Sequence, residues 1–176
     1  MLRLPEAPEE LETGHNSADF SDVGEQAMSS DDLWFMTAYL KIHLPKAANV
    51  AGVSLIEHRM AEGFAVPLHV HHDEDESFYI LDGEFRFQVG DNVLTVSAGQ
   101  ALHVPGGVVH SFRVISPEAR FLTITPGRFE AMVRTASRPA PAPILPPQKV
   151  PTPEEQDALV ALCAAHGIEF VGPSVQ

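Results

Sequence analysis

Short apolar and β-branched runs alternate with turn residues through the middle of the chain, from residue 33 to residue 124. The runs include WFMTAYLKI, GVSLIEHRM, SFYILDG, EFRFQVG and VVHSFRVI. Turn signals separate them, among others Asp82-Gly83, Gly90-Asp91-Asn92, Ala98-Gly99 and Pro105-Gly106-Gly107. Turns about every 8–12 residues, with no helix-length period between them, predict an all-β sandwich or barrel and exclude a βαβ architecture. We assign this barrel to residues 33–130.

The alternation within one of these runs indicates how a strand is buried. In EFRFQV, Phe85, Phe87 and Val89 share one face, whereas Arg86 and Gln88 share the other, because successive side chains of a strand point to opposite sides. This arrangement suits a sheet that turns one face toward a closed interior.

The two ends of the chain follow other patterns. Residues 1–32 hold nine acidic residues and one basic residue, with few large apolar residues and no clear period. We interpret them as an acidic N-terminal arm that is solvated or loosely docked, with an acidic interaction tail as the alternative. Residues 131–176 contain a stretch with seven prolines between positions 138 and 153, which must be extended because proline fixes φ and lacks a donor.

A short helix is predicted after this Pro-rich segment, in TPEEQDALVALCAAHG. Thr152 suits the N-cap, Pro153 the first helical position and Glu155 the third, which completes a capping box, and Gly167 ends the run. We expect this helix to dock on the barrel and Cys163 to be a buried small apolar residue rather than a nucleophile.

Composition and charge narrow the function classes. The 176 residues carry 11 Lys+Arg and 24 Asp+Glu, a formal charge of −13, which argues against nucleic acid and anionic membranes as main partners. The one cysteine excludes an intramolecular disulfide and a cysteine-based zinc site. No 18-residue apolar run and no secretory leader are visible, so we expect a cytoplasmic protein without a membrane span.

The histidines suggest the chemistry. His69 and His71 are two residues apart, so on a strand both imidazoles face one side. Glu76 follows five residues later, and His110 opens a further apolar run. A single histidine on a strand is more often structural than a ligand. Three neutral imidazoles and one carboxylate, however, make a site that suits Fe, Mn, Ni, Cu, Co or Zn, with coordination positions left for water, O₂ or substrate.

The spacing of these residues from nearby glycines is more specific than the histidines alone. The first segment reads Gly63, five residues, His69-x-His71, four residues, Glu76, six residues, Gly83. The second reads Gly99, five residues, Pro105-x-Gly107, two residues, His110. Together they resemble the two signature motifs of the cupin superfamily, although Val114 stands where the second motif usually ends in Asn. The Pro-rich segment and final helix also look like the tail of single-domain, quercetin-2,3-dioxygenase-like cupins.

The resemblance implies a small β-barrel of two facing antiparallel sheets, a jelly roll or double-stranded β-helix, with one divalent metal at one mouth. It implies four metal ligands: His69, His71, Glu76 and His110. It also implies a homodimer as the family's common state. A pocket above the metal is expected from the apolar residues Met60, Phe78, Ile80 and Phe112, for each of which a plain core position is the alternative.

Three functions remain open at this point. The first is a dioxygenase acting on a small aromatic or enol-type, flavonol-like substrate, with Glu76 as ligand and as base for the substrate hydroxyl. The second is a non-redox isomerase, cyclase or lyase that uses the metal as a Lewis acid, and the third is a small-molecule binding or sensing module. Phosphate-transfer enzymes are disfavoured because the chain has no Gly-rich phosphate loop and no Lys/Arg cluster.

Overall fold

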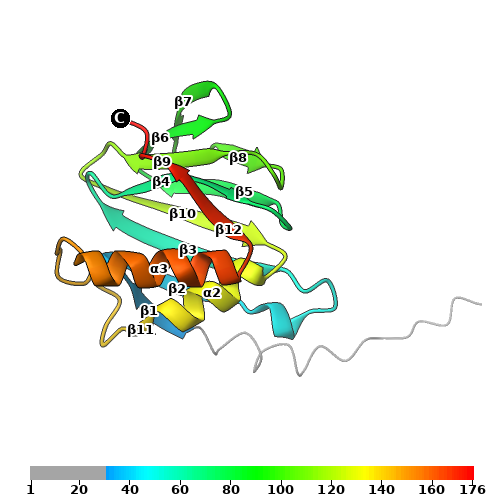
Figure 1. Ribbon diagram of the computed structural model, residues 1–176. Coiled ribbons are helices and arrows are strands. Elements are labelled where there is room, and N and C mark those ends of the chain that lie inside the picture. The colour runs from blue at the N-terminus through cyan, green and yellow to red at the C-terminus, as the bar shows by residue number, and fades with distance from the viewer. Residues whose placement is uncertain (1–30) are drawn as a thin grey trace, which may run out of the picture.

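The computed structural model describes residues 31–176 of the chain (Figure 1). The acidic arm expected over residues 1–32 lies outside the described residues, except for its last two positions. The predicted all-β class is confirmed, since strands form two antiparallel sheets and only two α-helices occur in residues 31–176. Neither of these two helices has the length and apolar character needed to cross a bilayer.

The larger sheet has seven strands in the order β11-β1-β2-β3-β10-β5-β8. Its strands are β1 (Asp31–Phe35), β2 (Ala38–Leu44), β3 (Ser54–Ala61), β5 (Glu76–Asp82), β8 (Ala101–Val104), β10 (Glu118–Thr125) and β11 (Arg138–Pro139). The smaller sheet has five strands in the order β12-β4-β9-β6-β7. Its strands are β4 (Ala65–His71), β6 (Glu84–Val89), β7 (Asn92–Ser97), β9 (His110–Val114) and β12 (Ile168–Gly172). Consecutive strands therefore often lie in different sheets, as in a jelly roll.

Five phenylalanine rings fill the space between the two sheets. Phe78 and Phe121 come from the larger sheet, whereas Phe85, Phe87 and Phe112 come from the smaller one. Their ring centroids lie 5.1–5.9 Å apart in most pairs, many of them in edge-to-face orientation. Each buried ring stabilises the fold by about 1.5–3 kcal/mol relative to an exposed one. This packing explains the alternation in EFRFQV, because Phe85 and Phe87 face the space between the sheets and are both fully buried.

The turn between β5 and β6 requires a glycine. Gly83 has a φ of +78°, and a Cβ at this position would lie 2.6 Å from the Glu118 carbonyl oxygen and 2.7 Å from the Ala119 Cβ. A side chain here would therefore be strained and would also collide with β10. The turn keeps β5 and β6 in different sheets and so fixes the direction in which β5 leaves the site.

Helix α3 (Pro153–Ala165) begins with the predicted capping box. The Glu155 amide donates to Thr152 Oγ1 at 3.2 Å, and the Thr152 amide donates to Glu155 Oε2 at 3.0 Å. Cys163 is buried, as expected for a small apolar residue, and Leu159 and Leu162 pack against the core beside it. The helix lies across one end of the barrel (Figure 1).

Helix α2 (Arg128–Ala136) was not predicted from the sequence. It begins directly after β10, at Gly127, and is only nine residues long. Its apolar face consists of the buried Met132 and Val133, a pattern too short to establish a helical period. A 3-10 turn (Lys46–Ala48) lies beside the start of this helix, where the Lys46 amide donates to the buried Glu130 at 2.7 Å.

Candidate metal centre

The structure brings together the four residues that the motif spacing singled out. His69 and His71 lie at the end of β4, Glu76 begins β5 and His110 begins β9. One ligand atom from each of the four lies within 4.8 Å of the others, and all four side chains are buried. His110 Nε2 is 3.1 Å from Glu76 Oε2, and His71 Nε2 is 3.6 Å from the same oxygen.

Hydrogen bonds on the outer side of each ring fix its orientation. His69 Nδ1 contacts the Pro67 carbonyl at 2.8 Å, and His110 Nδ1 contacts the Val108 carbonyl at 3.0 Å. A carbonyl only accepts, so in both rings Nδ1 must carry the proton. In both rings Nε2 then carries the lone pair, which is the tautomer that a metal ligand needs, and in His110 this atom faces Glu76 Oε2.

His71 is oriented by a carboxylate instead. Its Nδ1 lies 3.2 Å from Glu74 Oε1, and both side chains are buried. The other oxygen of Glu74 accepts from the amides of Arg128 and Phe129, at 3.1 and 3.3 Å, where α2 begins. Glu74 therefore ties a candidate ligand to the first turn of α2. The sequence did not reveal this role, because nothing distinguishes Glu74 from the acids on either side.

The electrostatics of the cluster suit a cation. Burial, with help from His110 and His71, lowers the pKa of His69 to about 3, so this ring is neutral at physiological pH. For Glu76, burial acts to raise the pKa, but His71 and His110 outweigh it and hold the pKa at about 2. For His71, burial acts to lower the pKa, but Glu76 and Glu74 raise it above its usual value. A buried anion thus faces imidazoles that can donate lone pairs.

A cavity of about 290 Å³ opens beside the cluster, and we call it the metal cavity. His69, His71 and Glu76 form part of its polar wall. The rest is largely apolar and includes Phe64, Val66, Phe112, Phe121, Phe129, Met132 and Phe170. This volume is at the lower end of the range for ligand sites, so it suits a small ring system.

The pocket expected from the sequence is corrected for three of its four residues. Phe112 lines the metal cavity, whereas Met60, Phe78 and Ile80 do not. These three are at most 2% exposed and lie in the core between the sheets, for example Phe78 against Phe87. The plain core position, which the sequence left open as the alternative, is the one that these three residues occupy. Strand parity alone does not show how far from the mouth of the barrel a residue lies.

His58 lines the metal cavity as well, although its sequence context suggested only a packing or surface residue. Its Nε2 lies 2.5 Å from Thr123 Oγ1, and its ring packs against Phe121 and Phe129. Burial lowers its pKa to about 4, against a smaller opposing effect of Glu76, so the ring is neutral. Among residues 31–176 no hydrogen-bond partner is found for Nδ1, which leaves this atom for a ligand.

Comparison with known proteins agrees with this geometry. The family model described as "Cupin domain" matches residues 56–125, the segment that contains all four candidate ligands. These 70 of the 176 residues are similar to a cupin domain. The chain is 33% identical over 79 residues to quercetin 2,3-dioxygenase of Bacillus subtilis, a match that covers 44% of this chain and 23% of that protein. It is 34% identical over 53 residues to an uncharacterized protein of Streptomyces coelicolor, covering 30% of this chain and 50% of that one.

A solved structure supports the fold of this chain. It is that of a predicted oxalate decarboxylase from Thermotoga maritima, which is 21% identical and covers 57% of this chain and 94% of that chain, with a TM-score of 0.50. The chain therefore spans half or less of the length of the two curated relatives, whereas the solved structure is covered almost completely. The jelly-roll barrel implied by the resemblance to the cupin motifs is confirmed.

Proposed function

We propose that this protein holds one divalent transition metal through His69, His71, Glu76 and His110, and that it acts as a dioxygenase on a small aromatic or enol-type, flavonol-like substrate. The observation that carries the proposal is the convergence of these four buried side chains, three of which (His69, His71 and Glu76) line a largely apolar cavity. Imidazole and carboxylate donors suit Fe, Mn, Ni, Cu, Co or Zn.

The bound metal would supply Lewis acidity toward a substrate oxygen and, if it is redox-active, access to O₂ chemistry. Glu76 contributes negative charge that offsets the metal, and it is the carboxylate nearest to a substrate hydroxyl that enters the cavity. A proton leaving that hydroxyl can pass to Glu76. The apolar wall excludes water and positions a flat ring by contact with Phe112 and Phe129.

His58 is the second polar group that can meet a substrate. Its ring is neutral and held by Thr123, so Nδ1 can hydrogen-bond a substrate oxygen from β3, which belongs to the other sheet from β4 and β9. A substrate with two oxygen functions, as in an enol or a hydroxylated ring, matches this pair of polar positions. The similarity to quercetin 2,3-dioxygenase of Bacillus subtilis supports the same substrate class.

The test begins with elemental analysis of protein purified without added metal. O₂ uptake is then measured with a panel of flavonols and 1,3-dicarbonyls, using protein loaded in turn with Fe, Mn, Ni, Cu, Co and Zn. We expect one metal per chain and uptake with at least one substrate, lost in Glu76→Gln. Turnover without O₂ would assign a non-redox isomerase, cyclase or lyase instead. Tight ligand binding without turnover would assign a binding or sensing module.

A further inference from the structure

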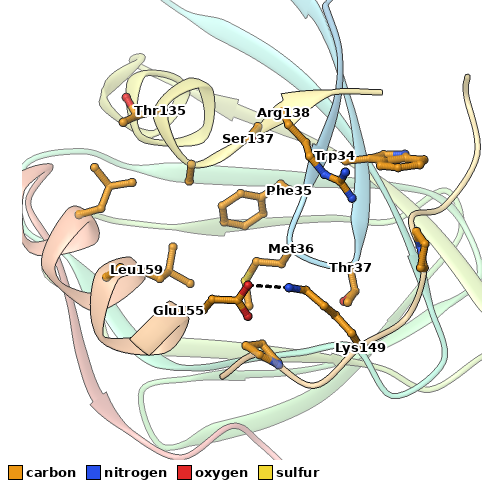
Figure 2. Close-up of a pocket in the computed structure, with 15 residues that line it drawn as sticks. Trp34, Phe35, Met36, Thr37, Thr135, Ser137, Arg138, Lys149, Glu155 and Leu159 are labelled. Atoms are coloured by element: carbon orange, nitrogen blue, oxygen red, sulfur yellow. Dashed lines mark hydrogen bonds and ion pairs between the residues drawn. The ribbon is translucent and has the colours of Figure 1, made fainter. Parts of the chain in front are cut away.

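We propose that a second cavity, which adjoins the metal cavity, holds the tail of a two-part ligand whose oxygen-bearing head lies at the metal. This inference rests on the proposed function and defines its substrate more closely. We call the second cavity the outer groove. It measures about 780 Å³ and lies between the β1–β2 turn, the end of α2, the Pro-rich segment and the first half of α3 (Figure 2).

The two cavities share part of their walls. Five residues line both of them: Phe35, Met36, Thr37, Pro151 and Leu159. The metal cavity alone, at about 290 Å³, has room for a small ring system but little for a second ring or a chain. A ligand larger than this can extend past the shared wall into the outer groove.

Met36 occupies the shared wall in an unusual conformation. It is the first of two residues that connect β1 to β2, where Phe35 pairs with Ala38, and its φ is +53°. Glycine is preferred at such a position, and a non-glycine residue there is strained. A long flexible side chain at a strained position, 40% exposed between two cavities, points to a role in the passage. We assign Met36 as the residue that sets its width.

The side chains that line the outer groove indicate which kind of ligand tail it would bind. The ring of Phe35 projects into it (Figure 2), and Leu159 and Leu162 of α3 add to an apolar floor. The Arg138 guanidinium lies 4.7 Å from the Trp34 ring centroid, and no acidic partner is found for it within residues 31–176. Lys149, in contrast, is paired with Glu155 at 2.6 Å. Within residues 31–176, the groove thus combines apolar walls with one cation that lacks an acidic partner.

A hydroxyl without a partner lies in the same wall. Ser137 Oγ is buried and has no hydrogen-bond partner in the described part of the chain. Ser137 and Arg138 both line the groove (Figure 2). An unsatisfied buried hydroxyl is destabilising, and a polar ligand atom that reached it would offset this cost. The matching tail is an aromatic or aliphatic chain that ends in a carboxylate.

The single tryptophan of the chain makes this testable, since Trp34 lies in the groove wall. Three probes are compared on zinc-loaded protein. They are acetylacetone, a 1,3-diketone with a long ω-carboxyalkyl chain, and the same diketone with a methyl end. We expect the carboxylate probe to quench Trp34 and to bind about tenfold more tightly than the methyl probe, and acetylacetone to leave Trp34 unchanged.

Variants separate the parts of the proposal. Arg138→Gln should remove the tenfold advantage of the carboxylate probe, measured by calorimetry, without changing acetylacetone affinity, whereas Arg86→Gln on β6 should change neither. Met36→Trp should block the tail, and calorimetry measures this because the variant adds a second tryptophan. Met36→Gly should bind the long probes at least as tightly as wild type. Binding of the long probes without quenching of Trp34 and without an effect of Arg138→Gln would overturn the proposal.

Failure of the proposed function is distinguishable from failure of this inference. If acetylacetone does not bind the metal-loaded protein, the proposed function is wrong. Titration of metal-free protein with decanoate, followed by Trp34 fluorescence, then tests the outer groove alone. Quenching of Trp34 that Arg138→Gln weakens supports the groove, and the absence of quenching at millimolar decanoate contradicts it.

Discussion

His69 and His110 lie directly opposite each other on β4 and β9, with ring centroids 4.2 Å apart. Each ring is held by a carbonyl two residues earlier in its own chain segment, Pro67 and Val108. The two histidines come from different motifs and are 41 residues apart in sequence, and the antiparallel register brings them together. The site is therefore organised by backbone geometry before any metal enters.

Glu74 is expected to position His71 for metal binding. Glu74→Gln keeps the size of the side chain but weakens the contact with His71 Nδ1, so metal affinity should fall roughly 10–100-fold. Competition with a chelator measures the dissociation constant, and the Co(II) absorption spectrum reports the change in ligand geometry. Asp73→Asn is the matched control, because Asp73 is exposed and pairs with Arg128. Equal affinities and identical spectra in wild type and Glu74→Gln would exclude a positioning role.

His58 should make metal-free protein sensitive to acid. Its pKa is about 4 in the folded protein and 6.5 ordinarily, so between these values the unfolded chain binds a proton that the folded chain does not. Folding stability must then decrease as the pH falls through this window. Between pH 7 and pH 5 this one group contributes about 2 kcal/mol of the loss.

Urea unfolding at pH 7 and pH 5 measures the effect. In His58→Gln the loss of stability over this interval should be smaller by about this amount, with His72→Gln as an exposed control. Both pH values lie above the range in which Glu76 takes up a proton, so Glu76 does not obscure the comparison. A stability loss as large in His58→Gln as in wild type would mean that His58 is not buried as a neutral ring.

Gly83 and Gly90 offer a matched pair for the fold. Both have positive φ, +78° and +55°, but an added Cβ meets β10 atoms only at Gly83 and nothing within 4 Å at Gly90. Gly90→Ala should cost about 1–2 kcal/mol from the backbone alone, and Gly83→Ala distinctly more. Thermal unfolding compares the two variants. Equal losses would show that the turn before β6 can relax away from β10.

The ligand set could be predicted from sequence because the information is local. The pairing of His69 with His71 follows from strand parity, and the glycine and proline spacings identify the turns that lead to Glu76 and His110. The capping box at Thr152 is equally local. These features need no knowledge of which strands become neighbours.

The cavity could not be predicted in the same way. Glu74 gains its role from amides of α2 that are 54 and 55 residues away, and His58 lines the cavity because β3 lies beside β10 across the barrel. Met60, Phe78 and Ile80 have the same parity as true lining residues, yet they lie deeper in the core. Helix α2 is too short for its period to be recognised, although Phe129 and Met132 of this helix line the metal cavity.

The most direct test of the central claim is the metal content of purified protein, measured by elemental analysis for wild type and single-histidine variants. Wild type and His72→Ala should each hold one transition metal per chain, since His72 is exposed and contacts Glu169 rather than the cluster. His71→Ala and His110→Ala should each hold far less, with circular dichroism showing that both remain folded. Full metal stoichiometry in both His71→Ala and His110→Ala would contradict the site.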